Sequence, residues 1–126
     1  MELAQVYYGK LHDLHNEVKS ICKKLSMLQS TLDRRIADIY HRIEETPIED
    51  LNELECLTEL KDVLQRRRLC KDEYAKMRPI LSKVERDMKA LEEKNDEIAN
   101  MSVYVRNRYN VSITVEELFA EIGMEI

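Results

Sequence analysis

The feature that most limits how this chain can fold is an apolar residue at every third or fourth position of its first 45 residues. The pattern runs through Leu11, Leu14, Val18, Ile21, Leu25, Leu28 and Leu32, with Ala4 and Tyr7 before it and Ile36, Ile39 and Ile43 after it. This spacing is typical of a coiled-coil seam. The two successive steps of four from Leu28 to Ile36 predict a stutter, which locally unwinds a supercoil. We therefore expect one long helix with a narrow apolar stripe.

A second seam with the same spacing occupies the middle of the chain. It comprises Leu60, Val63, Arg67, Cys70, Tyr74, Met77, Leu81, Val84, Met88 and Leu91, and it extends to Asn95 and Ile98. Pro79 lies inside this run, where it removes one backbone hydrogen bond and costs roughly 3 kcal/mol in an unbent helix. Because the seam keeps its phase across Pro79, we expect a continuous helix that is kinked there. A break into two helices is the alternative.

Only residues 44–47 separate the two seams, which predicts an antiparallel helical hairpin. Thr46, Pro47 and Glu49 have the types and spacing of an N-cap, a first helical residue and the second member of a capping box, so the second helix is expected to begin at Pro47. Folding there pairs residues whose numbers sum to about 92. The predicted fold is all-α, with a long coiled-coil hairpin over residues 1–101 and a small appendage over residues 102–126.

The appendage combines β-branched and aromatic residues with one more helix signal. Residues 103–105 and 109–113 fit either a short hairpin or an extended segment. Thr114 and Glu117 predict a capping box that opens a short helix, which Gly123 ends. The apolar face of this helix, formed by Leu118, Phe119 and Ile122, is expected to dock on the long helices or on a partner.

Composition excludes several other classes of protein. The 126 residues include only 2 Gly and 2 Pro, too few for the turns of a many-stranded sheet. The net charge of -5 argues against a protein that coats nucleic acid by charge alone. No apolar run is long enough to span a membrane, and the N-terminus does not resemble a secretory signal. We therefore expect a cytoplasmic protein with three reduced cysteines.

Catalytic and metal-binding patterns are missing from the sequence. It contains neither a phosphate-cradling Gly-rich loop nor the nucleophile motif of a hydrolase, so we expect no enzyme and no cofactor. Asp38 and His41 form one carboxylate-x-x-histidine pair, whereas a dinuclear helical-bundle site needs two such pairs. His12 and His15 are interpreted as ordinary helix-surface residues, and no metal is expected.

Four stretches of the chain resemble small uncharacterised helical proteins carried by phages and prophages of Bacillus-type bacteria. These stretches are residues 38–44 (DIYHRIE), Leu54 with Leu57, residues 64–68 (LQRRR) and residues 71–73 (KDE). The resemblance implies a phage accessory protein in a bacterial host cell. Within the class of interaction proteins, we expect an inhibitor or adaptor of a host protein. It implies no activity and no site residues.

The sequence thus predicts a non-enzymatic interaction module that self-associates, with a dimer as the expected form, and binds an unidentified protein partner. Arg67 is interpreted either as a seam charge that fixes register or as a side chain that reaches solvent. A nucleic-acid-associated protein is the alternative function, and a structural role in a virion or scaffold is a third. The nucleic-acid interpretation uses the cations from Arg66 to Arg78, together with Arg106, Arg108, Tyr104 and Tyr109.

Overall fold

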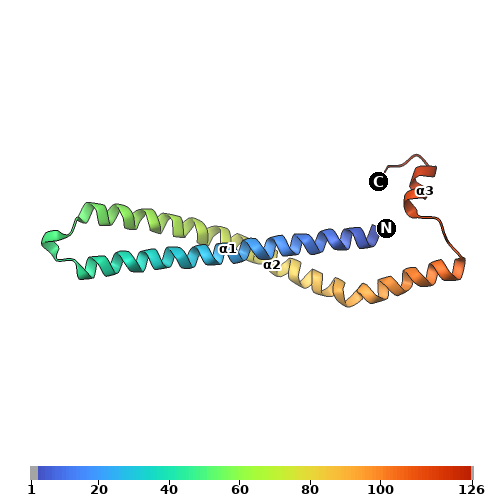
Figure 1. Ribbon diagram of the computed structural model, residues 1–126, viewed down its shortest axis with the longest axis horizontal. Coiled ribbons are helices and arrows are strands. Elements are labelled where there is room, and N and C mark those ends of the chain that lie inside the picture. Colours follow the sequence, from blue (N-terminus) through green and yellow to red (C-terminus); the bar gives the residue numbers. More distant parts are fainter. Residues whose placement is uncertain (1–2, 126) are drawn as a thin grey trace. The chain divides into compact units, whose positions relative to one another are not determined.

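A computed structural model describes residues 3–125 and confirms the all-α prediction (Figure 1). Helix α1 spans Leu3–Glu45, the 3₁₀ helix η1 spans Ile48–Asp50, helix α2 spans Glu53–Tyr109 and helix α3 spans Val115–Glu121. The long helices α1 and α2 pack against each other as a hairpin, and no strand occurs between residues 3 and 125.

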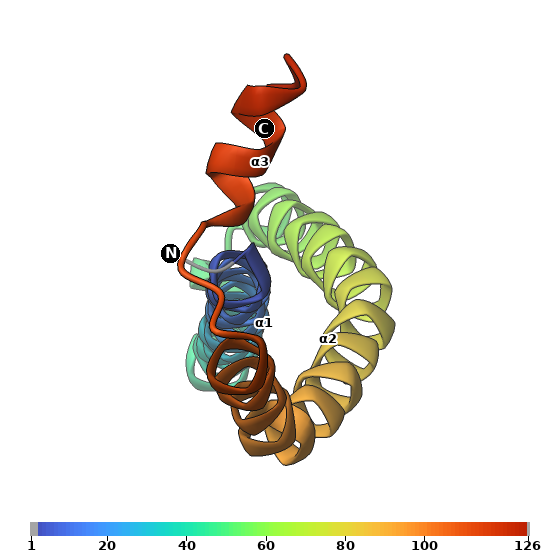
Figure 2. The same ribbon diagram turned by 90° about the vertical axis from the view of Figure 1, so that its right-hand side faces the viewer.

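The described residues form two compact units. Residues 16–83 form the hairpin unit, and residues 3–15 together with 84–125 form the terminal unit. The hairpin unit contains the turn and the adjoining parts of α1 and α2, which run side by side in opposite directions (Figure 1). In the terminal unit, α2 is followed by an extended segment and by α3 (Figure 2).

The turn of the hairpin is longer than predicted, because α2 begins at Glu53 and not at Pro47. Pro47 precedes the single turn of η1, which has no side-chain cap, so the capping box predicted at Thr46 is wrong. Asn52 caps α2 instead, since its Oδ1 accepts a hydrogen bond from the backbone N–H of Glu55 at 3.1 Å. Because the turn lies later in the sequence than predicted, each residue of α1 faces a later residue of α2.

Two interhelical ion pairs fix that register. Arg67 pairs with Asp33, and Arg42 pairs with Glu59, so these residue numbers sum to 100 or 101; the contact of Cys70 with Leu25 gives a sum of 95. The predicted sum of about 92 is therefore too low by about one to two helical turns, because it assumed the shorter turn.

From residue 18 onward, the buried stripe of α1 differs from the predicted one at two positions, and before it the predicted Leu11 and Leu14 are exposed. The stripe consists of buried or half-buried side chains whose spacing alternates between four and three without a break: Val18, Cys22, Leu25, Gln29, Leu32, Ile36, Ile39 and Ile43. Thr31, beside Leu32, is also half-buried. Cys22 and Gln29 replace Ile21 and Leu28, so the stripe has no stutter. The phase is set by Ile36, Ile39 and Ile43, which pack near the turn, and it continues backward from there.

Helix α2 passes through Pro79 without interruption, which confirms a continuous helix over a break at this position. It also extends to Tyr109, so the residues 103–105 that were assigned to a hairpin or extended segment are helical. Asn110 ends the helix in the left-handed conformation (φ 53°), and Val111 N–H donates to the carbonyl of Arg106 at 3.1 Å. This helix-ending geometry outweighs the weak strand preference of two valines and a tyrosine.

Candidate interaction surface

The hairpin unit has a closed apolar core that ties the two helices together. Leu32, Ile39, Val63 and Cys70 are buried in one cluster, with Leu25, Ile36, Ile43 and Leu60 packed around it. The thiol of Cys70 also donates to the carbonyl oxygen of Leu25 on the facing helix at 3.3 Å. This core leaves little of the central seam available to a partner, so any binding surface of the hairpin unit must lie on its flanks.

The structure places the predicted seam residues of α2 on one continuous stripe. Val63, Cys70 and Met88 are buried, and Leu60, Arg67, Tyr74, Met77, Leu81, Val84 and Leu91 are half-buried. In α1, Val18, Leu25 and Leu32 are covered, whereas Leu11, Leu14, Ile21 and Leu28 are between 44% and 48% exposed. Ile21 and Leu28 are seven residues apart, so within the hairpin unit they form an exposed apolar strip beside the seam.

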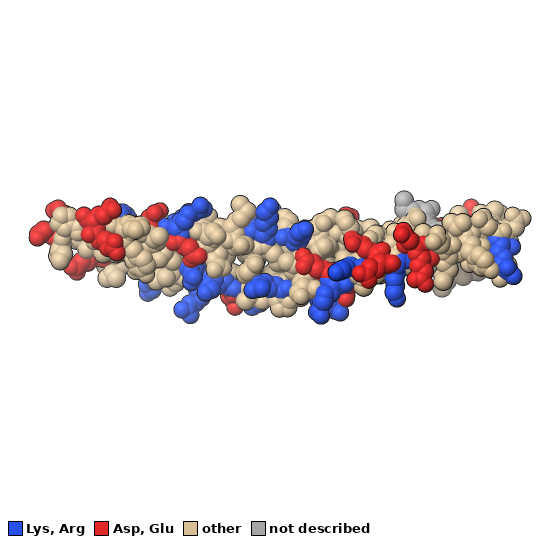
Figure 3. All heavy atoms as spheres, turned by 90° about the horizontal axis from the view of Figure 1, so that it is seen from below, with Lys and Arg blue, Asp and Glu red and all other residues tan. Residues whose placement is uncertain are grey.

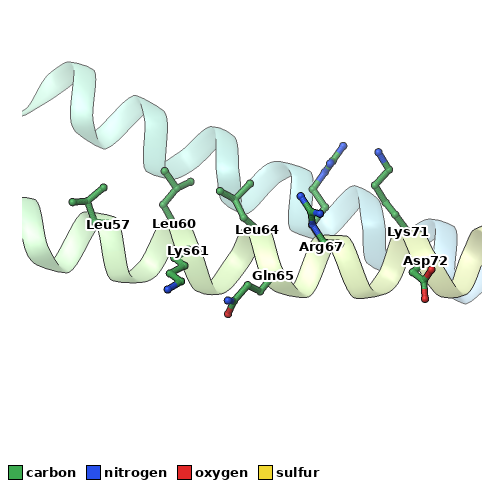
Figure 4. A pocket seen from close by; sticks show the side chains of 9 residues that line it. Leu57, Leu60, Lys61, Leu64, Gln65, Arg67, Lys71 and Asp72 are labelled. Atoms are coloured by element: carbon green, nitrogen blue, oxygen red, sulfur yellow. The ribbon is translucent and has the colours of Figure 1, made fainter.

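An apolar groove runs along α2 near the turn (Figure 4). Leu57, Leu60 and Leu64 form its floor, and the leucines at 57 and 64 are 64% and 43% exposed. Its volume is about 750 Å³. The remaining lining residues are mostly long and polar: Lys61, Gln65, Arg67, Arg68, Lys71 and Asp72. An apolar floor with a cationic rim is the composition expected of a surface that packs against another amphipathic helix.

Arg67 lies on the seam, and an acidic group reaches it from the facing helix. Its Nε donates to Oδ1 of Asp33 at 2.5 Å, and about a third of its side chain is exposed. The pair therefore joins α1 and α2 beside the core through a charge-assisted hydrogen bond, with 47% of the Asp33 side chain exposed. This contact favours the register role of Arg67 over a side chain that only reaches solvent.

Two other cations of the hairpin unit form ion pairs along α2 itself. Arg66 binds Asp62 at 2.9 Å, and Lys76 binds Asp72 at 2.7 Å, both four residues apart. The hydrogen bond to Asp72 raises the pKa of Lys76, and the one from Arg42 to Glu59 raises the pKa of that guanidinium. Figure 3 shows acidic side chains at the turn end of the hairpin unit and basic ones beyond them. The cations from 66 to 78 therefore do not form one unpaired patch.

The terminal unit contains a second apolar groove of about 780 Å³. Ile98, Met101, Val105, Val111 and Ile113 line it together with residues 3–5 of α1 and Leu118 of α3. Phe119 is half-buried, whereas Ile122 is 70% exposed. Of the three predicted docking residues, Leu118 thus lines a groove within this unit and Ile122 faces solvent.

Helix α3 has the capping box that the sequence predicts. Glu117 N–H donates to Oγ1 of Thr114 at 3.2 Å, and Thr114 N–H donates to Oε2 of Glu117 at 3.3 Å. Gly123 follows the helix with φ 75°, and Met124 N–H donates to the carbonyl of Phe119 at 2.9 Å. A helix of seven residues is too short to persist on its own propensity, so these end contacts determine whether it forms.

Thr114→Ala should therefore loosen α3 selectively. Loss of the capping oxygen is expected to cost about 1 kcal/mol of local stability. Amide hydrogen exchange should accelerate several-fold over residues 115–121 and stay unchanged over the hairpin unit. Thr114→Ser keeps the acceptor and is the control. Equal exchange in the two variants would show that α3 is held by packing and not by its cap.

No group of three or more His, Cys, Asp or Glu side chains that could hold a metal occurs between residues 3 and 125. His15 lies 3.7 Å from Glu85 through its Nε2. The three cysteines are free thiols, two of them buried. Within the same described range, no helix is long and apolar enough to cross a membrane.

Comparison of the chain with protein-family models, curated proteins and solved structures finds no match. The exposed surface of the chain is therefore the basis for inferring a function. Sequence reasoning missed Leu57 and Leu64 as surface-forming residues, although their seven-residue spacing one position after the seam is a signal that could have identified them.

Proposed function

We propose that this chain is a non-enzymatic coiled-coil module that self-associates and presents an apolar surface to a protein partner. The observation that carries the proposal is the groove over Leu57, Leu60 and Leu64, which stays open although the adjoining seam is closed. Each leucine side chain that becomes buried contributes about 1.5–3 kcal/mol. Covering this groove with another helix is thus a direct source of binding free energy.

A second exposed strip supports the partner-binding half of the proposal. Ile21 and Leu28 lie on α1 beside the seam and are nearly half exposed. Exposed apolar side chains are ordinary when they occur singly, but aligned ones mark interaction sites. A module with two apolar flanks can bind a second copy with one of them and a different protein with the other.

Leu57→Glu with Leu64→Glu tests self-association through the groove. We expect the wild-type chain to sediment as a concentration-dependent dimer and the double variant as a monomer of unchanged helicity, because two charges now line the groove. The matched control is Leu54→Glu with Leu69→Glu. These two leucines of α2 lie outside the groove and are 76% and 66% exposed. The dimer of this control should persist. A wild-type chain that stays monomeric at millimolar concentration contradicts self-association.

A nucleic-acid-associated function is the second candidate, favoured by one arrangement at the end of α2. The guanidinium of Arg108 lies 5.8 Å from the ring centre of Tyr104 and 5.9 Å from that of Tyr109, and both tyrosines are exposed. Exposed aromatic rings beside an arginine can stack on unpaired bases. A gel-shift titration with labelled single-stranded DNA at low salt tests this candidate. Binding that is lost in Tyr104→Ala with Tyr109→Ala would support it, and no shift would dismiss it.

A further inference from the structure

The groove on α2 lies within a row of side chains that is acidic at one end, apolar in the middle and basic at the other end. Glu53, Leu57, Leu64 and Arg68 are all exposed, and at 100° per residue they fall within an arc of about 60° on the helix. Glu53 precedes Leu57 by four residues, and Arg68 follows Leu64 by four residues. The row therefore reads the same in both directions, except that the sign of the charge reverses.

From this symmetry we infer that the groove is occupied by α2 of a second copy of the chain, in antiparallel orientation about a two-fold axis between Lys61 and Leu60. Leu57 of one copy then packs against Leu64 of the other, and Glu53 faces Arg68. The inference rests on the proposed self-association and specifies its geometry. Because a two-fold contact uses the same surface on both copies, that surface must complement itself, as this row does.

The charges distinguish this arrangement from a parallel one. In a parallel pair in register, Glu53 would face Glu53 and Arg68 would face Arg68, so both ends would repel. In the antiparallel pair, both ends attract. Lys61 comes nearest to its own counterpart across the axis, and this like-charge contact weakens the dimer. With a small apolar centre, we expect a dissociation constant of about 1–100 μM.

A charge-exchange experiment tests the pairing of Glu53 with Arg68. Glu53→Arg and Arg68→Glu should each weaken the dimer about tenfold, because each variant replaces two attractive contacts by two repulsive ones. The double variant restores attraction, so its dissociation constant should return to within about threefold of the wild-type value. Lys89→Glu with Glu92→Arg makes the same exchange on α2 outside the groove, and it should leave the dimer unchanged. Single variants without effect, or a double variant no better than either, would overturn the pairing.

Cross-linking tests the register directly. Lys61→Cys places a thiol close to the two-fold axis, where the two copies are offset by only about 1.5 Å along the helix, so a short bismaleimide should link them efficiently. Asp72→Cys, also on the rim of the groove, leaves its two thiols about 35 Å apart along the helix and should not cross-link. The unmodified chain controls for the native cysteines.

Different results would contradict self-association through the groove and its antiparallel register. If Leu57→Glu with Leu64→Glu gives a monomer, but Lys61→Cys does not cross-link and the charge exchange does not rescue, self-association through the groove stands and the antiparallel register falls. If the wild-type chain is monomeric at every concentration, self-association and the register both fall.

Discussion

Ile39→Ala is expected to lower the free energy of unfolding by about 3–5 kcal/mol. Ile39 is the most deeply buried side chain of the hairpin unit, with 1% of its surface exposed, and it sits in a cluster with Leu32, Val63 and Cys70. Removing three carbons there leaves a cavity between two helices that are held apart by their remaining side chains, so the site collapses only in part. Urea titration followed by circular dichroism at fixed protein concentration measures the effect.

Ile48→Ala is the matched control for that measurement. Ile48 lies in η1 and is 81% exposed, so the same exchange should change stability by less than about 0.5 kcal/mol. An equally small effect at Ile39 would contradict the packed core of the hairpin unit. A smaller dimer population in Ile39→Ala would not by itself contradict this core, because the outer surface of the hairpin exists only when the hairpin is folded.

Periodicity was sufficient to predict the fold class and the stripe of α2. On that helix, the predicted stripe with a spacing of three and four has Arg67 as its only polar member before Asn95. The buried and half-buried residues from Leu60 to Leu91 are the residues of this stripe. The capping box at Thr114 was also predictable, because both of its hydrogen bonds are local and depend on a four-residue pattern.

On α1 two neighbouring stripes have the same spacing, and choosing the more apolar residue at each step gives the wrong residue at two positions. Ile21 and Leu28 are more apolar than Cys22 and Gln29, yet the latter pair is covered. The choice depends on the facing helix and on the phase that Ile36 and Ile43 impose from the turn. Such information is non-local, and a single-helix pattern does not contain it.

The turn and the C-terminal end of α2 also depend on information that the local sequence pattern does not contain. Thr46, Pro47 and Glu49 match a helix start in every residue type, but Asn52 is also a suitable N-cap. Which of the two begins α2 depends on the length of turn that places Arg42 beside Glu59, and this contact is not local in sequence. At Asn110, a helix end that uses the left-handed region was overlooked because three strand-forming residues precede it. The groove was not predicted, because leucines 57 and 64 lie one position beside the seam and outside its spacing of three and four.

Pro79→Ala is expected to raise the free energy of unfolding by up to about 3 kcal/mol. Pro79 is exposed inside the continuous helix α2, where it provides no backbone N–H for the carbonyl of Ala75 and its ring crowds that carbonyl. Alanine restores the hydrogen bond and is the best helix former. Thermal and urea unfolding should both report the gain, and Ser82→Ala, an exposed exchange three residues later, should contribute only a few tenths of a kcal/mol through propensity.

The size of the gain tells what the proline does for the fold. Met77 and Leu81, which flank Pro79 on the seam, are half-buried, so any bend at residue 79 changes how α2 follows α1 on both sides of it. If the bend is needed to keep those side chains on the seam, straightening the helix removes part of their burial and the gain shrinks or changes sign. A full gain would show that the seam tolerates a straight helix. A loss of stability would show that the bend is part of the packing, and Met77→Ala should then cost less in the Pro79→Ala background than in the native one.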